Sequence, residues 1–212
     1  MKRHLLILSL LGCLLLPSML QAQPVLRNLG LLREGDLLFH VAQQENPITQ
    51  STNHMGDYSL DHVAIYFLYQ GCPSVVEAVE KGVVITPLDS FLLSGEQYLV
   101  GRVKSKLDRK HTIKNALNYL GHPYDFYFLP DEQEIYCSEL VLLSFVDKHG
   151  RAVFAPVAMS FHDSEGQILP YWTAHYATIG HEVPEGLPGS NPSELAKRKN
   201  VKIKGIFSAT AP

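Results

Sequence analysis

The sequence predicts an α+β fold with an antiparallel sheet and few helices. Short apolar runs bounded by glycine and proline recur through the first half of the chain, as is typical of strands. Two of these runs, 61–68 and 75–79, flank a turn around residues 71–73 and are expected to pair as a hairpin. Helical patterns are confined to a few segments, and no repeat or low-complexity tract is present.

The strands are expected in the following order along the chain. Gly35-Asp36 predicts a turn that leads into a buried strand at 37–39. Residues 43–59, rich in Gln, Asn, Ser and Thr, predict a polar loop before the hairpin. Further strands are expected at 83–85, 98–103 and 201–207.

Three helices are expected among these strands. Residues 86–95 predict a short helix, because a Thr-Pro pair offers a cap followed by proline, and a glycine ends the segment. Residues 108–120 predict a second helix with Asp108 as its cap. A third helix is expected to begin near Cys137 and to run to Gly150. It is apolar nearly all round and should therefore be buried.

Composition excludes several classes of protein. The 212 residues are 46% hydrophobic and 18% charged, which is typical of a globular chain and excludes a disordered or fibrous one. A formal net charge of −3 without a basic run argues against a nucleic-acid partner. The 3 cysteines are too few for a disulfide scaffold.

The first 22 residues have the layout of a secretory signal peptide. Two basic residues precede an apolar run at 5–16, and Ala22 fits the last position before cleavage. A retained membrane anchor and a lipoprotein signal with Cys13 lipidated are the alternatives. The apolar run is short for a membrane span, and the residues after Cys13 remain apolar. We therefore expect an exported protein, periplasmic or extracellular, with no transmembrane span after signal removal.

Cys137 is the main candidate for covalent chemistry because it stands at the expected start of a buried helix. The unpaired amides and the positive dipole at that end favour a thiolate, which is the nucleophilic form of cysteine. The same amides could hold an oxyanion, with the Cys137 N–H as one donor. The alternative is a small buried hydrophobic side chain, the commonest role of a lone cysteine.

His62 and Glu77 are the candidates for its partners. His62 begins a hydrophobic strand and could act as a general base or as the imidazolium partner of a thiolate. Glu77 interrupts an apolar strand, so it needs a partner if it is buried; otherwise it faces solvent. Two hairpin registers put Glu77 opposite Ile65 or Tyr66, and only the second puts it on the face of His62. Contact therefore requires strand twist or a shifted register.

Two other hydrolase classes find little support. A zinc enzyme lacks the His-Glu-x-x-His motif and paired cysteines, which leaves His162-Asp163 and His175 with His181 as weak candidate ligands. A serine hydrolase would carry Gly-x-Ser-x-Gly, which is absent.

A disulfide between Cys72 and Cys137 is a stronger alternative, because export makes it chemically feasible. Bridged cysteines need Cα atoms within about 7 Å. Cys72 lies in the expected hairpin turn, far along the strand from His62, so Cys137 cannot contact both. The catalytic thiol and the disulfide therefore exclude each other.

Five short motifs follow one another between residues 35 and about 146. They are Gly35-Asp36-Leu37-Leu38-Phe39, Asp61-His62-Val63-Ala64-Ile65-Tyr66, Val76-Glu77-Ala78, Gly121-His122-Pro123-Tyr124-Asp125 and Tyr136-Cys137-Ser138-Glu139-Leu140-Val141. In this order they resemble the permuted papain-like amidases of the YiiX/YaeF type, which are related to the NlpC-type cell-wall peptidases. The resemblance implies a circularly permuted papain-like fold with Cys137 as nucleophile, His62 as base and Glu77 as the group that orients the histidine.

The resemblance also frames the expected organisation and substrate. A single hydrolase domain is expected at 23–212, with a family-divergent extension from about 150. Tyr124 and Tyr136 could hydrogen-bond a substrate carbonyl or simply pack the helix start, and Asp36 and Asp125 are expected to be structural caps.

A small amide or peptide is the expected substrate, and export favours a cell-wall peptide. Lipid or amino-acid amides, acyl transfer to an amine, and a non-catalytic peptide- or lipid-binding module are the alternatives. No cofactor or metal is expected.

Overall fold

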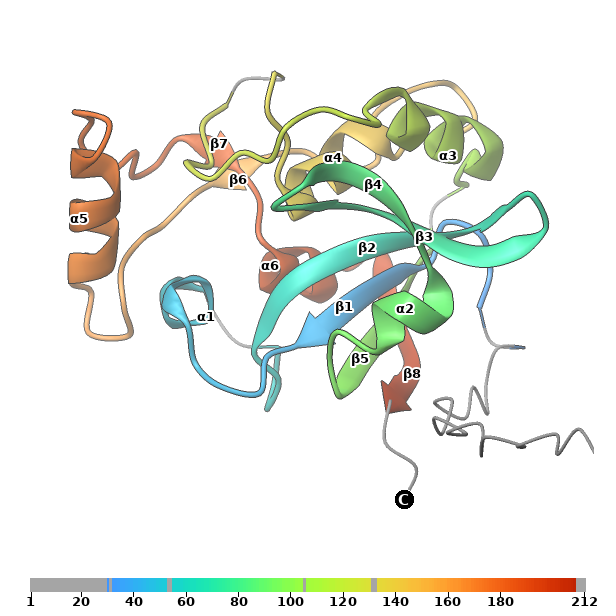
Figure 1. Ribbon diagram of the computed structural model, residues 1–212, viewed down its shortest axis with the longest axis horizontal. Coiled ribbons are helices and arrows are strands. Elements are labelled where there is room, and N and C mark those ends of the chain that lie inside the picture. The colour runs from blue at the N-terminus through green and yellow to red at the C-terminus, as the bar shows by residue number, and fades with distance from the viewer. Residues whose placement is uncertain (1–29, 31, 53–54, 105, 131–132, 209–212) are drawn as a thin grey trace, which may run out of the picture.

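The computed structural model places a six-stranded antiparallel sheet at the centre of the molecule (Figure 1). The described residues are 30, 32–52, 55–104, 106–130 and 133–208. The strand order is β4-β3-β2-β1-β5-β8. These strands are β1 (Leu37–Val41), β2 (Leu60–Tyr69), β3 (Cys72–Val79), β4 (Gly82–Pro87), β5 (Gln97–Val103) and β8 (Val201–Ser208). The expected signal peptide and Cys13 lie outside the described residues.

Helices cover both faces of this sheet. Over the described ranges they are α1 (Pro47–Ser51), α2 (Leu88–Leu92), α3 (Arg109–Asn118), α4 (Cys137–Ser144), α5 (Pro170–Ala177) and α6 (Pro192–Lys197). A second, two-stranded sheet joins β6 (Val157–Ala158) to β7 (Pro188–Gly189). Figure 1 shows α5 set apart from the large sheet. None of the helices in the described part is long and apolar enough to cross a membrane.

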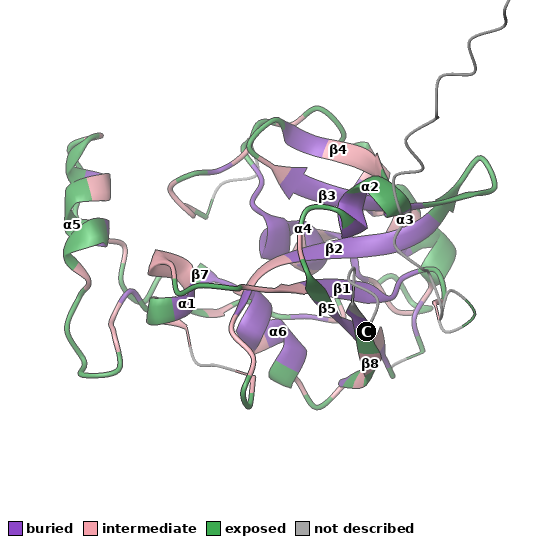
Figure 2. Cartoon of the chain, turned by 60° about the horizontal axis from the view of Figure 1, so that its bottom comes forward, coloured by how far each residue is buried: buried purple, intermediate pink, exposed green. Residues whose placement is uncertain are grey.

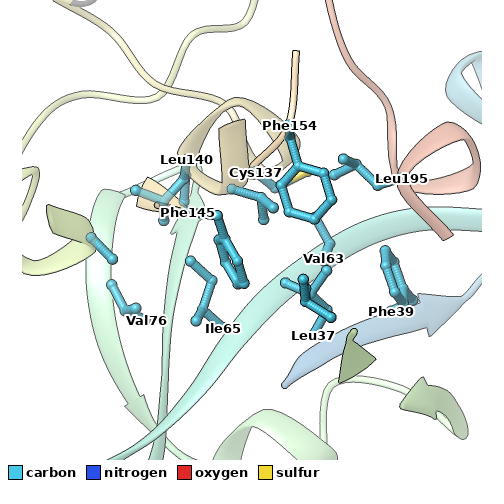
Figure 3. Packing of buried hydrophobic residues seen from close by; sticks show 14 of the residues in the cluster. Leu37, Phe39, Val63, Ile65, Val76, Cys137, Leu140, Phe145, Phe154 and Leu195 are labelled. Atoms are coloured by element: carbon cyan, nitrogen blue, oxygen red, sulfur yellow. The ribbon is translucent and has the colours of Figure 1, made fainter. Parts of the chain in front are cut away.

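Strand alternation divides the core between the two faces of the sheet. Val63 and Ile65 of β2 belong to the cluster that includes the side chains of α4 and α6, whereas Ala64 and Tyr66 pack with α2. Figure 3 shows Ile65 beside Phe145, which follows α4, and Val63 beside Phe154. The nucleophile candidate belongs to this first cluster, so the core itself fixes the start of α4.

The β2–β3 hairpin is paired only over its outer half. It turns through Gln70 and Gly71, whose φ angles of 52° and 83° are typical of the two-residue turn that favours glycine. Pairing extends inward to Ile65 opposite Val76 and stops there. From that point β2 stays with β1 and β3 stays with β4, so the two strands diverge. Figure 2 shows α4 behind the opening between them.

A β-bulge marks the beginning of β2. His40 pairs with His62, and the next residue of β1, Val41, pairs with Leu60. Asp61 is therefore the extra residue of the bulge. Bulges change the direction of a side chain and are frequent beside active sites.

Most of the expected elements are confirmed. Strands occur at each expected position, and α3 begins after Asp108, whose carboxylate accepts a hydrogen bond of 3.1 Å from the His111 N–H. The expected hairpin is present, although Cys72 and Pro73 belong to β3 and not to the turn. The third helix begins at Cys137 as predicted.

Three expectations about boundaries are wrong. The polar segment 43–59 contains α1, because Asn46 and Thr49 form a capping box around a proline. The helix expected from Thr86 begins only at Leu88 and lacks a side-chain cap. The helix from Cys137 ends at Ser144, where the backbone becomes extended, and does not reach residue 150.

Candidate active site

Cys137 is the first residue of α4 and is only 5% exposed. The preceding residue, Tyr136, is extended and provides no side-chain cap, so the first amides of the helix keep no local side-chain partner. Glu139 lies in the first turn, where a carboxylate is favoured by the helix dipole. The thiol is therefore packed in the core on one side and lies beside helix amides on the other.

His62 and Glu77 meet where the two hairpin strands diverge. His62 Nε2 lies 2.7 Å from Glu77 Oε2, and the Thr86 hydroxyl donates a hydrogen bond of 2.5 Å to Glu77 Oε1. The register differs from both expected ones, since continuing the ladder from Ile65–Val76 would put Glu77 opposite Ala64. Ala64 and His62 point to the same face of β2, which allows the contact.

Two partners determine the protonation of His62. Burial alone lowers the pKa of this imidazole, but hydrogen bonds and charge interactions with Cys137 and Glu77 outweigh it and raise the pKa from 6.5 to about 10. Since Nε2 contacts Glu77, Nδ1 is the ring nitrogen left for the thiol. At neutral pH the ring is therefore an imidazolium between the sulfur and the carboxylate.

The divergence of β2 and β3 explains how residues from opposite faces of the sheet come together. Cys137 belongs to the core on the α4 face, whereas His62 lies near Phe91 of α2, with ring centroids 6.3 Å apart. Continuous pairing of β2 with β3 would separate them. The opening of the ladder lets the imidazole reach the thiol.

A pocket with an empty volume of about 420 Å³, including the solvent space at its open mouth, lies beside Cys137. Its walls come from α1, the loop before α4 and the segments on either side of α5. The lining residues are Ile48, Ser51, Thr52, Asp61, Tyr124, Phe128, Tyr136, Cys137, Ser138, Met159, Ser160, Phe161, Trp172, Ser190, Asn191 and Pro192. The lining combines aromatic rings with small polar side chains. We call this space the nucleophile pocket.

Both candidate tyrosines line the nucleophile pocket, but they differ in their contacts. The Tyr136 hydroxyl accepts a hydrogen bond of 3.1 Å from the Ser190 N–H, so it holds the wall at the end of β7. Little space is left at Gly189, because a Cβ there would lie 2.6 Å from Met159 Cγ and 2.9 Å from that hydroxyl. Burial and the charge of Cys137 raise the pKa of Tyr124, which therefore keeps its phenolic proton.

A second histidine–carboxylate pair lies beside the first and was not predicted from the sequence. His40 Nδ1 lies 2.6 Å from Asp61 Oδ1, and the Asn46 amide donates a hydrogen bond of 2.8 Å to Asp61 Oδ2. Asp61 also lines the nucleophile pocket. Thr86 was missed as well, because its proline neighbour indicated a helix cap. Only knowledge of the bulge and of the strand divergence would have revealed these roles.

The structure also decides between the alternatives for the other polar residues. Cys72 and Cys137 are free thiols, exposed and buried respectively. Within the described ranges, no group of three or more His, Cys, Asp or Glu residues is placed to hold a metal ion.

The candidate zinc ligands and the two aspartates have other partners. His162 lies 3.2 Å from Glu185, and His175 hydrogen-bonds the Phe126 carbonyl. Asp36 forms a bidentate ion pair with Arg102, and Asp125 accepts a hydrogen bond from the Tyr127 N–H. Both aspartates have the structural roles expected of them.

Residues 31–203 match the family model of the "Permuted papain-like amidase enzyme, YaeF/YiiX, C92 family". The chain belongs to this family. The match confirms the resemblance carried by the five motifs, and it continues past the last of them to include α5, α6 and the beginning of β8.

Two relatives illustrate the similarity. "Uncharacterized protein YiiX" of Escherichia coli strain K12 is 35% identical over 147 residues, which are 66% of this chain and 65% of that protein, less than two thirds of its length. The crystal structure of the metalloprotein YiiX from Escherichia coli O157:H7 superimposes with a TM-score of 0.65 at 22% identity. That superposition covers 82% of this chain and 96% of the other, and it confirms the fold.

Proposed function

We propose that this protein is a cysteine amidase in which Cys137 attacks the carbonyl carbon of an amide. The observation that carries the proposal is the single hydrogen-bonded line from the helix-start thiol through His62 to Glu77, with the histidine pKa raised to about 10. This arrangement supplies a thiolate together with the acid that its leaving group needs.

The reaction proceeds in two steps. The thiolate forms a bond to the carbonyl carbon, the C–N bond breaks, and His62 gives its proton to the departing amine. Neutral His62 then takes a proton from water as the water attacks the thioester. The carboxylic acid product leaves, and the thiolate–imidazolium pair is restored. Glu77 holds the ring by its Nε2, so that Nδ1 stays directed at the sulfur.

Two donors can stabilise the oxyanion of each tetrahedral intermediate. The Cys137 N–H lies at the positive end of α4, where backbone amides are free to bind an anion. Tyr124 lines the same pocket, and its hydroxyl keeps its proton. Tyr136 contributes less directly, because its hydroxyl already supports the wall at Ser190.

An N-acyl amide with an apolar acyl group fits the nucleophile pocket better than a cell-wall peptide does. Its lining includes several aromatic rings, among them Phe128, Phe161 and Trp172. These rings provide an apolar surface that matches an apolar acyl group. The basic and apolar start of the sequence supports export of this enzyme.

The similar structure from Escherichia coli O157:H7 is described as a metalloprotein, which raises the question of a metal centre here. The described residues lack a ligand group suited to one, so no step of the proposed reaction passes through a metal.

Incubation with N-dodecanoyl p-nitroanilide and, separately, with cell-wall fragments tests the proposal. Intact-protein mass spectrometry should detect a dodecanoyl adduct on Cys137, and p-nitroaniline should be released. The Cys137→Ala variant should fold normally and lose both signals, while Cys72→Ser should keep them. Full turnover by Cys137→Ala would refute the mechanism.

The same experiment separates the other candidate functions. An adduct from cell-wall fragments alone would favour a peptidase. Transfer of the acyl group to an added amine would indicate an acyltransferase. Binding without an adduct would indicate a non-catalytic module.

A further inference from the structure

We propose that the amine part of the substrate carries an anionic group, such as a carboxylate, which binds beside Lys197 at the polar end of the cleft. This inference rests on the proposed amidase function and adds a specificity determinant to it. It follows from a cleft whose two ends differ in chemistry, from unpartnered hydroxyls between the thiol and the polar end, and from one unpaired cation.

The nucleophile pocket shares lining residues with two further pockets. On one side it shares Ile48, Tyr124, Phe128 and Trp172 with a pocket that also contains Tyr171 and His175. On the other side it shares Ser51, Thr52, Ser160 and Asn191 with a pocket that also contains Glu194, Lys197 and Arg198. The thiol therefore lies between an aromatic arm and a polar arm.

Buried hydroxyls lead from the thiol toward the polar arm. Ser138 and Ser190 are lining residues of the nucleophile pocket, and Thr52 lines both this pocket and the polar one. All three oxygens are buried and have no hydrogen-bond partner among the described residues. A buried polar atom without a partner is costly, so these groups favour a ligand that carries hydrogen-bonding atoms along this path.

The charged side chains of the polar arm leave one positive charge without an ion-pair partner in the described part of the chain, which favours an anionic ligand. Glu194 and Arg198 neutralise each other through two hydrogen bonds of 2.7 and 2.8 Å. Asp61, the carboxylate of the nucleophile pocket, is held by His40 and Asn46. Lys197 forms no ion pair within the part of the chain that the structure describes. Its ammonium is the charge left to attract a ligand.

The different chemistry of the two arms indicates which half of the substrate each arm binds. An apolar acyl chain fits the aromatic arm, so the group on the nitrogen side of the scissile bond extends into the polar arm. Cleavage then releases an amine that carries the anion. The thioester left on Cys137 is apolar and is attacked by water entering from the vacated polar arm.

Binding of two matched ligands tests this assignment without relying on turnover. The probes are dodecanoyl-glycine and its uncharged counterpart dodecanoyl-glycinamide, titrated calorimetrically into the Cys137→Ala protein. We expect the carboxylate ligand to bind about fivefold more tightly, because a partly exposed ion pair contributes about 1 kcal/mol. The preference should shrink as salt rises. Lys197→Ala in the same background should remove it, and Lys197→Glu should reverse it.

Lys204→Ala is the matched control, since Lys204 is an exposed lysine of β8 outside these pockets. It should leave the preference unchanged. Equal binding of the two ligands, or equal loss for both on Lys197→Ala, would overturn the inference. Failure of the proposed function is a separate result, because it would appear as absence of turnover of both probes by the unmodified enzyme while the binding preference persists.

Discussion

Two histidine–carboxylate pairs lie side by side on the sheet and have nearly equal contact distances, although His40 uses Nδ1 and His62 uses Nε2. His40 and His62 are cross-strand partners in β1 and β2. His40 lies 2.6 Å from Asp61, and His62 lies 2.7 Å from Glu77. A search for histidine–carboxylate pairs alone would give both the same weight.

The pairs differ in what the histidine faces. Each carboxylate accepts a further hydrogen bond, Asp61 from Asn46 and Glu77 from Thr86, so both histidines are equally well supported. His62 additionally interacts with the Cys137 thiol, whereas His40 packs against Tyr98 with ring centroids 5.4 Å apart. Proximity to the diverging strands, and not the pairing with a carboxylate, distinguishes the histidine that contacts the thiol from the one that does not.

Replacement of each histidine by alanine gives the largest expected difference. His62→Ala should lower kcat for N-dodecanoyl p-nitroanilide about a thousandfold, since it removes the general acid and base. It should also slow alkylation of Cys137 by iodoacetamide at neutral pH. His40→Ala should lower kcat less than about tenfold. Circular dichroism checks that both variants fold, and equal losses of kcat would contradict the distinction.

Neutralising each carboxylate should give a smaller difference with a diagnostic pH dependence. Glu77→Gln keeps an acceptor for His62 but removes the charge, so kcat should fall about thirtyfold, less than for His62→Ala. The alkaline limit of activity should move to lower pH, because Glu77 helps to raise the pKa of His62. Asp61→Asn should leave that limit in place. An unchanged pH profile of Glu77→Gln would contradict the role assigned to this carboxylate.

The raised pKa of His62 also predicts how stability depends on pH. Its pKa is about 10 in the folded protein and 6.5 in the unfolded chain, so the folded state binds the proton more tightly. The resulting stabilisation is complete below about pH 6.5 and is lost as the pH rises to about 10. Urea unfolding should therefore show the advantage of the wild type over His62→Ala shrinking across this range. A constant difference between pH 6 and pH 10 would contradict the raised pKa.

The fold was largely predictable because its strands have regular local patterns. The hairpin, the final strand and the helix that begins at Cys137 all follow from apolar runs bounded by turn residues. The wrong predictions concern segments whose local pattern fits two different structures. The Thr86-Pro87 pair fits a helix start, but Thr86 instead extends β4 and donates to Glu77.

The sequence indicated which residues of the candidate site would be neighbours, but not the geometry of their contacts. Motif order singled out Cys137, His62 and Glu77, and the structure brings all three together. The contact depends on the point at which β2 and β3 diverge, which is decided by packing against α4 and by the pairing of each strand with its outer neighbour. The bulge at Asp61 is a comparable case, because one extra residue in a ladder leaves no periodic signal.

Replacing the two residues that hydrogen-bond the carboxylates, Thr86 and Asn46, should give the smallest effects. One should change kcat and the other KM. Thr86→Val keeps the branched shape but removes the donor to Glu77, so kcat should fall about threefold with KM unchanged. Asn46→Ala removes both the donor to Asp61 and the cap of α1, at a cost of about 1 kcal/mol in stability. Because α1 forms a wall of the nucleophile pocket, KM should rise about threefold while kcat is kept. Steady-state kinetics separates the two outcomes. A fall in kcat for Asn46→Ala would mean that the Asp61 pair acts on the reacting atoms, and the two histidines would then share the chemistry.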